Sequence, residues 1–373
     1  MRFDLLVPCA SGLEGLVGKE IRHLGYDCQV ENGAVRLVGN EHDIAKLNLH
    51  LRIADRVKII MGTFKATTFD ELYAGVRKLA WQDILPMDAN FPVSGRSIRS
   101  SLHAVPSCQS ITKKAIVDKM KQIYHRQGKL PESGASYPVE VSIRKNKAML
   151  TVDTTGDSLF KRGYRLHKGP APLKENMAAA LLALTTWFPN RPFADPTCGS
   201  GTIPIEAARW AMNIAPGLNR TFLCEDWRNF PAESFEELRE QAKGSVNHDI
   251  ELDILAADID HRMIAIAEEN AKKAGVHQQI HFKQMQVADF TTDQKFGIML
   301  CNPPYGERLE NKDSVHKLYR TIGNVFRPMT TWSKYILTSD LKFEDYYGAK
   351  ATKRRKLYNG KLRTDLFQFW GDK

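Results

Sequence analysis

The pattern that most constrains this chain is the alternation of short apolar strands with amphipathic helices after residue 171. The expected strands are 193–197, 254–257, 280–284, 297–301 and 335–338, and the expected helices include 172–187, 202–212 and 314–326. Such alternation buries each strand between helices on the two faces of one sheet. It predicts an α/β fold with a doubly wound parallel sheet.

The first 153 residues mix helices and strands without this regularity. Apolar residues at helical spacing predict helices at 13–24, 69–79 and 111–124. Alternating segments predict a hairpin around Asn32-Gly33 and a strand pair within 139–153. The polar, glycine-containing stretch that follows is typical of a linker. The sequence thus predicts a separate N-terminal α+β region.

Positive charge is concentrated in one part of the chain. The net charge is +10, and residues 93–168 hold fifteen Lys and Arg against five Asp and Glu. A second run, 350–363, has seven basic residues and no acid. Clustered basic charge is typical of a nucleic-acid footprint. The candidate RNA contacts in the first cluster are Lys113, Lys114, Lys145, Lys147, Arg162 and Arg165.

Other features narrow the class of protein. The six cysteines are scattered without a C-x-x-C pair, and the histidines show no ligand spacing, so we expect no disulfide scaffold and no metal site. The N-terminus has an acid within a short apolar run, unlike a signal peptide. The longest mainly apolar run, 177–188, is too short to cross a bilayer. A cytoplasmic protein without membrane contact is expected.

A glycine-containing loop, DPTCGSG, joins the first expected strand of the second half to its helix. Gly199 and Gly201 permit a tight turn and a close approach of a ligand to the backbone. A dinucleotide fingerprint has a third glycine where Pro204 stands and an acid about 20 residues on, whereas Asp258 follows Asp195 by 63 residues. The loop therefore favours an adenosyl ligand without a pyrophosphate over a dehydrogenase cofactor.

Acidic residues follow the next two expected strands. Asp258 can accept hydrogen bonds from ribose hydroxyls, and Asp289 from an adenine amine. Asp260 is expected to cap a helix. Ligands bind at the carboxyl ends of parallel strands, so we expect Asp258 and Asp289 to lie with the loop residues Asp195 and Thr197.

The tetrapeptide Asn302-Pro303-Pro304-Tyr305 ends the fourth expected strand. Two prolines fix φ and remove two N–H donors, which leaves a rigid rim of acceptors. If Asn302 Oδ1 and the Pro303 carbonyl accept N–H groups of an exocyclic amine, the nitrogen lone pair is freed to attack a methyl group. Tyr305 is expected to stack on the flipped base.

Cys198 and Cys301 stand beside these two motifs. A thiolate nucleophile would instead allow covalent chemistry at C5 of a pyrimidine. A cysteine that ends a buried strand is more often a small core residue, and the amine mechanism is the one we expect.

Five segments together resemble the bacterial THUMP-domain RNA methyltransferases of the large-subunit rRNA guanine-N2 type. They are DTTGDSLFKRGYR (153–165), APLKENMAAALL (171–182), DPTCGSGTIPIEAA (195–208), IAPGLNR (214–220) and NPPYGERL (302–309). The resemblance implies a ferredoxin-like region at 1–60, a THUMP RNA-binding domain at 61–155 and a linker at 156–170. It also implies a Rossmann-like class I methyltransferase domain at 171–373.

The resemblance also assigns site residues. It implies S-adenosylmethionine binding by Asp195, Thr197, Gly199, Gly201, Asp258, Asp289 and Asn302, and target-base binding by Asn302, Pro303 and Tyr305. Lys174, Glu175 and Asn176 resemble the segment that closes over the methionine end of the cofactor, although Asn176 stands where the family has Thr.

These features predict an S-adenosylmethionine-dependent RNA N-methyltransferase that modifies the N2 amine of a guanine in 23S rRNA. Residue chemistry alone does not separate guanine N2 from adenine N6 or cytosine N4. Two alternatives remain open: a methyltransferase for protein glutamine amides, and a non-catalytic RNA-binding factor for ribosome assembly. The basic segment opposes the first alternative, and the intact motifs oppose the second.

Overall fold

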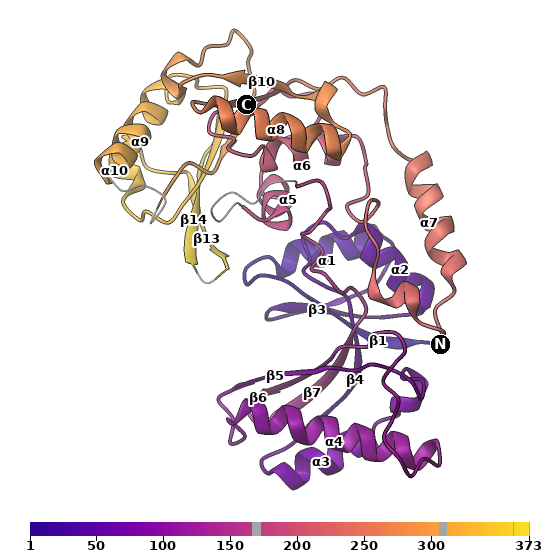
Figure 1. The fold of residues 1–373 in the computed structure, drawn as a ribbon. Coiled ribbons are helices and arrows are strands. Elements are labelled where there is room, and N and C mark those ends of the chain that lie inside the picture. Colours follow the sequence, from indigo (N-terminus) through magenta and orange to yellow (C-terminus); the bar gives the residue numbers. More distant parts are fainter. Residues whose placement is uncertain (166–172, 306–311, 361, 373) are drawn as a thin grey trace.

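The computed structural model describes residues 1–165, 173–305, 312–360 and 362–372, which fold around two seven-stranded sheets (Figure 1). The first sheet lies in the N-terminal half and the second in the C-terminal half. None of the helices within these described ranges is long and apolar enough to cross a membrane.

The N-terminal sheet has the order β2-β3-β1-β4-β7-β6-β5. Its strands are β1 (Phe3–Pro8), β2 (Gln29–Glu31), β3 (Ala34–Gly39), β4 (Lys58–Lys65), β5 (Val93–Ile98), β6 (Val139–Arg144) and β7 (Lys147–Asp153). Its helices are α1 (Glu14–His23), α2 (Glu41–His50), α3 (Phe69–Lys78) and α4 (Val105–Ile123). Because β4 pairs with both β1 and β7, the expected division at residue 60 falls inside a strand that the two N-terminal regions share.

The C-terminal sheet has the order β10-β9-β8-β11-β12-β14-β13 and confirms the doubly wound prediction. Its strands are β8 (Phe193–Asp195), β9 (Ile254–Asp258), β10 (His281–Gln284), β11 (Ile298–Cys301), β12 (Ser333–Thr338), β13 (Lys353–Asn359) and β14 (Leu362–Phe369). Its helices are α5 (Glu175–Ala183), α6 (Thr202–Ala211), α7 (Ala232–Gly244), α8 (His261–Ala274), α9 (Lys312–Phe326) and α10 (Phe343–Tyr347). The first five strands of this order are parallel and β14 is antiparallel to both of its neighbours.

The chain order creates one switch point in this sheet. From β8 the chain proceeds to β9 and β10 on one side, and it then returns to β11 on the other side. A crevice forms outside the carboxyl ends of strands at such a point. The glycine loop follows β8 and the NPPY tetrapeptide follows β11, so the topology brings the two motifs to the same crevice.

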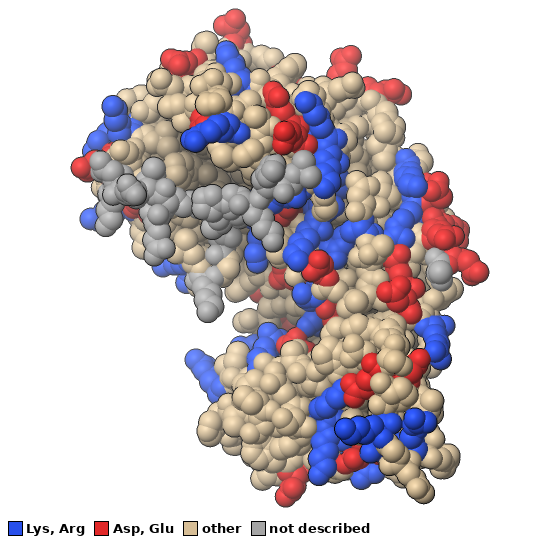
Figure 2. All heavy atoms as spheres, in the orientation of Figure 1, with Lys and Arg blue, Asp and Glu red and all other residues tan. Residues whose placement is uncertain are grey.

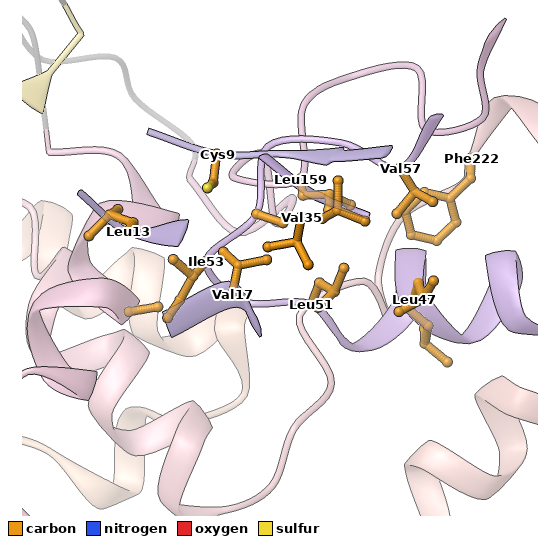
Figure 3. Packing of buried hydrophobic residues seen from close by; sticks show 14 of the residues in the cluster. Cys9, Leu13, Val17, Val35, Leu47, Leu51, Ile53, Val57, Leu159 and Phe222 are labelled. Atoms are coloured by element: carbon orange, nitrogen blue, oxygen red, sulfur yellow. The ribbon is translucent and has the colours of Figure 1, made fainter. Parts of the chain in front are cut away.

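The segment after β7, expected to be a linker, is packed into the core. Thr154 and Thr155 are fully buried, and their hydroxyls bond to the Val57 carbonyl and to Asn48 Oδ1. Figure 3 shows Leu159 from this segment among apolar residues of the N-terminal half, with Phe222 of the C-terminal half beside Val57. The connection between the halves is therefore a buried element.

Arg162, expected to contact RNA, is instead buried in this connection, with its side chain fully covered. Its guanidinium donates to the carbonyls of Arg52 and Leu159 and lies 3.5 Å from Glu206 Oε2. Tyr164 donates to the other oxygen of Glu206 at 3.1 Å. A guanidinium enclosed in this way cannot reach phosphates, so the RNA-binding prediction for Arg162 is wrong.

The long stretch between α6 and β9 also joins the halves. The Trp227 ring stacks on Tyr137 at 4.4 Å between centroids, and its indole N–H donates to the Ser136 carbonyl at 2.9 Å. Arg228 bonds to Asp88 at 2.7 Å. This stretch attaches the C-terminal half to the N-terminal half, and its insertion accounts for the distance between Asp195 and Asp258 in the sequence.

We predict that Arg162→Ala destabilises the protein by about 3–5 kcal/mol, because it leaves Glu206 buried without its cationic partner. The neighbouring Lys161→Ala is the matched control. Lys161 forms an exposed pair with Asp157, four residues away, and its loss should cost less than about 1 kcal/mol. Urea unfolding measures both values, and equal destabilisation by the two variants would contradict the role of the buried pair.

Candidate active site

The glycine loop is held by one hydrogen bond to the end of β8 and by two to the end of β9. The buried carboxylate of Asp195 accepts from the Thr197 N–H at 3.2 Å, and the Cys198 N–H donates to the Ala257 carbonyl at 2.8 Å. The Gly199 N–H donates to Asp258 Oδ2 at 2.9 Å. Asp195, Thr197, Gly199 and Asp258, separated in sequence, thus meet at the crevice.

The two loop glycines have different local roles. Both have positive φ, +52° at Gly199 and +79° at Gly201. A Cβ at Gly201 would lie 2.9 Å from the Ala267 side chain, whereas a Cβ at Gly199 would meet only Met263 Cε, at 4.0 Å. Gly201 therefore lets the loop pack on α8, and Gly199 leaves backbone open to a ligand.

The end of β9 offers acceptors and an apolar surface. Asp258 accepts one backbone N–H on each oxygen, from Gly199 and Asp260, and each oxygen retains a lone pair for a ribose hydroxyl. Asp260 accepts from the Arg262 N–H and caps α8, as predicted. Ile259, which the sequence motifs did not single out, is 65% exposed beside Asp258. An apolar side chain exposed here suits the face of a purine.

Asp289 is far from the loop residues in the sequence, but like them it follows the carboxyl end of a parallel strand. It ends a short 3-10 turn (Val287–Asp289) that follows β10, and its side chain is exposed. The structure thus leaves the Asp289 carboxylate available for a ligand. No described interaction links Asp289 to Asp258, so its contact with adenine stays a prediction.

The NPPY tetrapeptide presents an acceptor at the end of β11. Asn302 Oδ1 is buried and has no hydrogen-bond partner within the described ranges. A buried carbonyl oxygen without a partner costs about 1–3 kcal/mol, which a ligand N–H can recover. Tyr305 is only 3% exposed, so its ring is covered here, and stacking on a base stays a prediction.

Burial changes the protonation of groups beside these motifs. It raises the pKa of Asp195 well above its usual value, and the nearby Asp258 charge adds to this effect. Burial also raises the pKa of the Cys198 and Cys301 thiols well above their usual value. Both cysteines are therefore neutral thiols, which opposes a thiolate nucleophile.

Arg165, expected to contact RNA, braces the glycine loop. Its guanidinium donates to Ser200 Oγ at 3.3 Å, Thr202 Oγ1 at 3.0 Å and Glu175 Oε1 at 3.1 Å. A further bond reaches the Leu173 carbonyl at 3.0 Å. Every nitrogen of this guanidinium has a protein partner, so the RNA-binding prediction for Arg165 is wrong.

The start of α5 joins the loop region to the N-terminal half. Asn176 Nδ2 donates to Asp55 Oδ1 at 2.9 Å and to the Ile53 carbonyl at 3.3 Å. Both acceptors belong to the N-terminal half. Asn176, which stands where the resemblance led us to expect Thr, thus supplies a side-chain amide that donates hydrogen bonds from the C-terminal half to the N-terminal half.

The remaining RNA-binding candidates lie in two places. Lys113 on α4 is paired with Glu132 at 2.6 Å and also donates to the Phe91 carbonyl, while Lys114 on the same helix is exposed. Lys145 and Lys147 are exposed at the turn between β6 and β7. Figure 2 shows basic side chains along the hollow between the two lobes of the molecule.

The strand order and the two motifs at its switch point define a class I methyltransferase. Comparisons with known proteins specify the family. Residues 162–368 match the family described as RMKL-like, methyltransferase domain, residues 4–58 match an RlmL ferredoxin-like domain, and residues 66–153 match a THUMP domain. The chain belongs to the RMKL-like methyltransferase family.

Two curated relatives illustrate the family. YpsC of Bacillus subtilis (strain 168), named a candidate RNA methyltransferase, is 49% identical over 99% of this chain and 96% of its own. Ribosomal RNA large subunit methyltransferase K/L of Cellvibrio japonicus (strain Ueda107) is 32% identical over 99% of this chain and 51% of its own. The chain thus spans about half the length of this K/L protein.

Two solved structures are also similar. SMU.472, described as a candidate methyltransferase complexed with SAH, is 50% identical with a TM-score of 0.95, covering 100% of this chain and 99% of its own. A protein of Listeria monocytogenes str. 4b F2365, described as a predicted N6-adenine-specific DNA methylase, is 54% identical with a TM-score of 0.95, covering 100% and 97%. The cofactor of this chain is S-adenosylmethionine.

Gly201→Ala should weaken binding of S-adenosylhomocysteine at least tenfold, because the new methyl group forces the loop away from α8. Gly275→Ala is the matched control: Gly275 also has positive φ, +74°, but a Cβ there meets nothing within 4 Å. It should cost about 1 kcal/mol of stability and leave affinity unchanged. Calorimetric titration of both variants checks this, and equal affinities would contradict the assigned role of Gly201.

Proposed function

We propose that this enzyme methylates the exocyclic N2 amine of a guanine in 23S rRNA. The observation that carries the proposal is the buried Oδ1 of Asn302, which has no hydrogen-bond partner in the described part of the chain. Asn302 directly follows β11 at the switch point, opposite the glycine loop. An amine that donates to this oxygen is held where a methyl donor bound by the loop can reach it.

The chemistry follows from these positions. The lone pair of an exocyclic amine is delocalised into its ring, so the nitrogen is a poor nucleophile. N–H bonds to Asn302 Oδ1 and to the Pro303 carbonyl draw the nitrogen toward tetrahedral geometry and localise its lone pair. S-adenosylmethionine supplies the electrophilic methyl group when it is bound. The amine proton leaves to solvent after transfer, and catalysis comes mainly from positioning.

The chain offers fitting contacts for each part of the cofactor. The open backbone at Gly199 accommodates the ligand, Asp258 accepts from the ribose hydroxyls, and Asp289 accepts from the adenine amine. Ile259 packs on the purine face. We assign cofactor binding to Asp195, Thr197, Gly199, Gly201, Asp258, Asp289 and Asn302.

RNA is the substrate class that the chain outside the catalytic domain favours. The THUMP match, the basic charge of 93–168 and the names of the YpsC and K/L relatives support it. The K/L name supports large-subunit rRNA, and such a substrate places the enzyme in the cytoplasm. Adenine N6 is the alternative that the description of the Listeria protein favours, since the same acceptors would bind its amine.

Asn302→Ala should lower transfer of labelled methyl from S-adenosylmethionine to rRNA at least about 100-fold, because the target amine loses its fixed acceptor. Binding of S-adenosylhomocysteine should stay within about threefold of wild type, because Asn302 is one of seven assigned cofactor contacts and the other six remain. Asn190→Ala is the control, because Asn190 is exposed and lies before the amino end of β8, whereas the crevice is at the carboxyl end. Full activity in Asn302→Ala would defeat the mechanism.

The modified nucleoside identifies the amine. After incubation with rRNA from a strain lacking the enzyme, we expect mass spectrometry to find N2-methylguanosine in a 23S fragment. N6-methyladenosine would establish the adenine alternative. Labelled methyl found only in protein, as N-methylglutamine, would replace the RNA proposal with the amide one.

A further inference from the structure

We propose that the open face of the β4-β7-β6-β5 portion of the N-terminal sheet binds single-stranded RNA and takes one unpaired base into a pocket at its inner end. This inference rests on the proposed RNA substrate and identifies where that RNA lies. It places the contact on the sheet, away from the α4 lysines that the sequence had suggested.

The two faces of this sheet differ sharply in exposure. Val139, Val141 and Ile143 are buried on the face that α3 and α4 cover. On β5 the alternate residues Ser94, Arg96 and Ile98 are exposed. Arg96 is 60% exposed in its side chain and Ile98 is 50% exposed. The second face is therefore open along β5 and at the outer ends of β6 and β7, where Arg144 and Lys147 are exposed, whereas Thr151 of β7 on the same face is buried.

Strand register aligns basic residues across the uncovered face. At the outer end, Ile98 pairs with Arg144, which pairs with Lys147, which in turn pairs with Lys65. One step inward, Arg96 pairs with Ser142, and Arg96 Nε donates to its hydroxyl at 2.9 Å. Directly opposed residues point to the same side of a sheet.

The charge of this face fits a polyanion. This face has five basic residues, Lys58, Lys65, Arg96, Arg144 and Lys147, and two acidic residues, Glu140 and Asp153. Both acids lie at the inner end, where Arg56 pairs with Asp153 and both Lys58 and Arg96 pair with Glu140. At the outer end, Lys65, Arg144 and Lys147 have no acidic partner among the described residues. This outer part therefore has uncompensated positive charge beside the exposed Ile98, and such a mixture suits phosphates next to unstacked bases.

The inner end of the face is hollowed into a pocket of about 440 Å³. Its polar wall has the paired ions of Arg56, Lys58, Glu140 and Asp153, and its apolar wall has Pro138 and Leu223. Because the ions already neutralise each other, the pocket does not favour a phosphate. A neutral, flat group with donors and acceptors fits both walls, as a nucleobase does.

The location suits a substrate of the catalytic half. Figure 1 shows α3 and α4 on the side of this sheet that faces away from the C-terminal sheet. Figure 2 shows that the surface between the two lobes is hollowed. RNA on the open face is thus on the same side of the N-terminal sheet as the catalytic half, whereas RNA on α4 would lie on the far side.

The test compares two double variants of equal charge change. Arg144→Gln/Lys147→Gln should bind a fluorescein-labelled 12-nucleotide single-stranded RNA at least tenfold more weakly than wild type in anisotropy titrations. The slope of log K against log salt should fall by about 1.4, since each lost phosphate contact removes about 0.7. Lys114→Gln/Lys119→Gln on α4 should change affinity less than twofold. Unchanged binding by the first variant, or equal losses in both, would overturn the proposal.

Ser94→Trp tests the pocket separately. Ser94 is exposed at the pocket rim, and an indole there fills the space for a base without changing charge. Affinity for the same RNA should fall at least fivefold while the salt slope stays that of wild type; wild-type affinity would refute the base pocket. Thermal melting within about 2 °C of wild type shows that each variant is folded.

Methyl transfer by the wild-type enzyme reports on the proposed function independently. If the wild type methylates rRNA and Arg144→Gln/Lys147→Gln binds RNA as the wild type does, the proposed RNA surface is wrong and the proposed function stands. If the wild type methylates no RNA but its oligonucleotide binding still depends on Arg144 and Lys147, the proposed function is wrong and the RNA surface stands.

Discussion

The buried guanidinium of Arg162 bonds to a carbonyl of the N-terminal half and faces the carboxylate of Glu206 on α6 of the catalytic half. Burial of either charge without the other would cost a large desolvation free energy, because an ion removed from water needs a close partner and further hydrogen bonds. The pair thus requires the two halves to stay in one arrangement. The position of the RNA-binding region relative to the crevice depends on this requirement.

The same connection reaches the cofactor site. Arg165, three residues after Arg162, bonds to Ser200 and Thr202 at the start of α6 and to Glu175 at the start of α5. Asn176, next to Glu175, bonds back to Asp55 in the N-terminal half. The glycine loop, which we propose binds the methyl donor, and the half with the THUMP domain, which we propose binds RNA, are therefore supported by one hydrogen-bonded framework. This framework would hold substrate and cofactor at a fixed separation.

Much of the catalytic fold was predictable, because strand and helix periodicity and the residues at strand ends are local properties. The strands around the switch point, the Asp260 cap and the approach of the glycine loop to Asp258 follow from them. The expected helix at 111–124 begins earlier, at Val105, because Pro106 is tolerated in its first turn. Helical periodicity alone therefore underestimated α4.

The errors arose where a basic side chain could face either water or the interior. Arg162 and Arg165 look like RNA contacts in a charge count, yet both guanidinium groups donate their hydrogen bonds to buried protein groups. The second basic run behaves similarly, since Arg354 and Arg363 pair with the buried Asp365 and Arg355 bonds to the Gly12 carbonyl. Charge counting treats all cations alike, whereas burial separates structural cations from available ones.

The sequence by itself determined the class of fold, the glycine loop after β8 and the NPPY tetrapeptide after β11, because each depends on residues that are neighbours along the chain. Only the tertiary structure decided which face of the N-terminal sheet is open, which arginines are enclosed and that the apparent linker is core. Those outcomes depend on contacts between residues far apart in the sequence. One example is the hydrogen bond from the Arg162 guanidinium to the Arg52 carbonyl, which spans more than a hundred positions. No local pattern records such pairings, because desolvation and hydrogen bonding between distant segments are settled only when the halves pack.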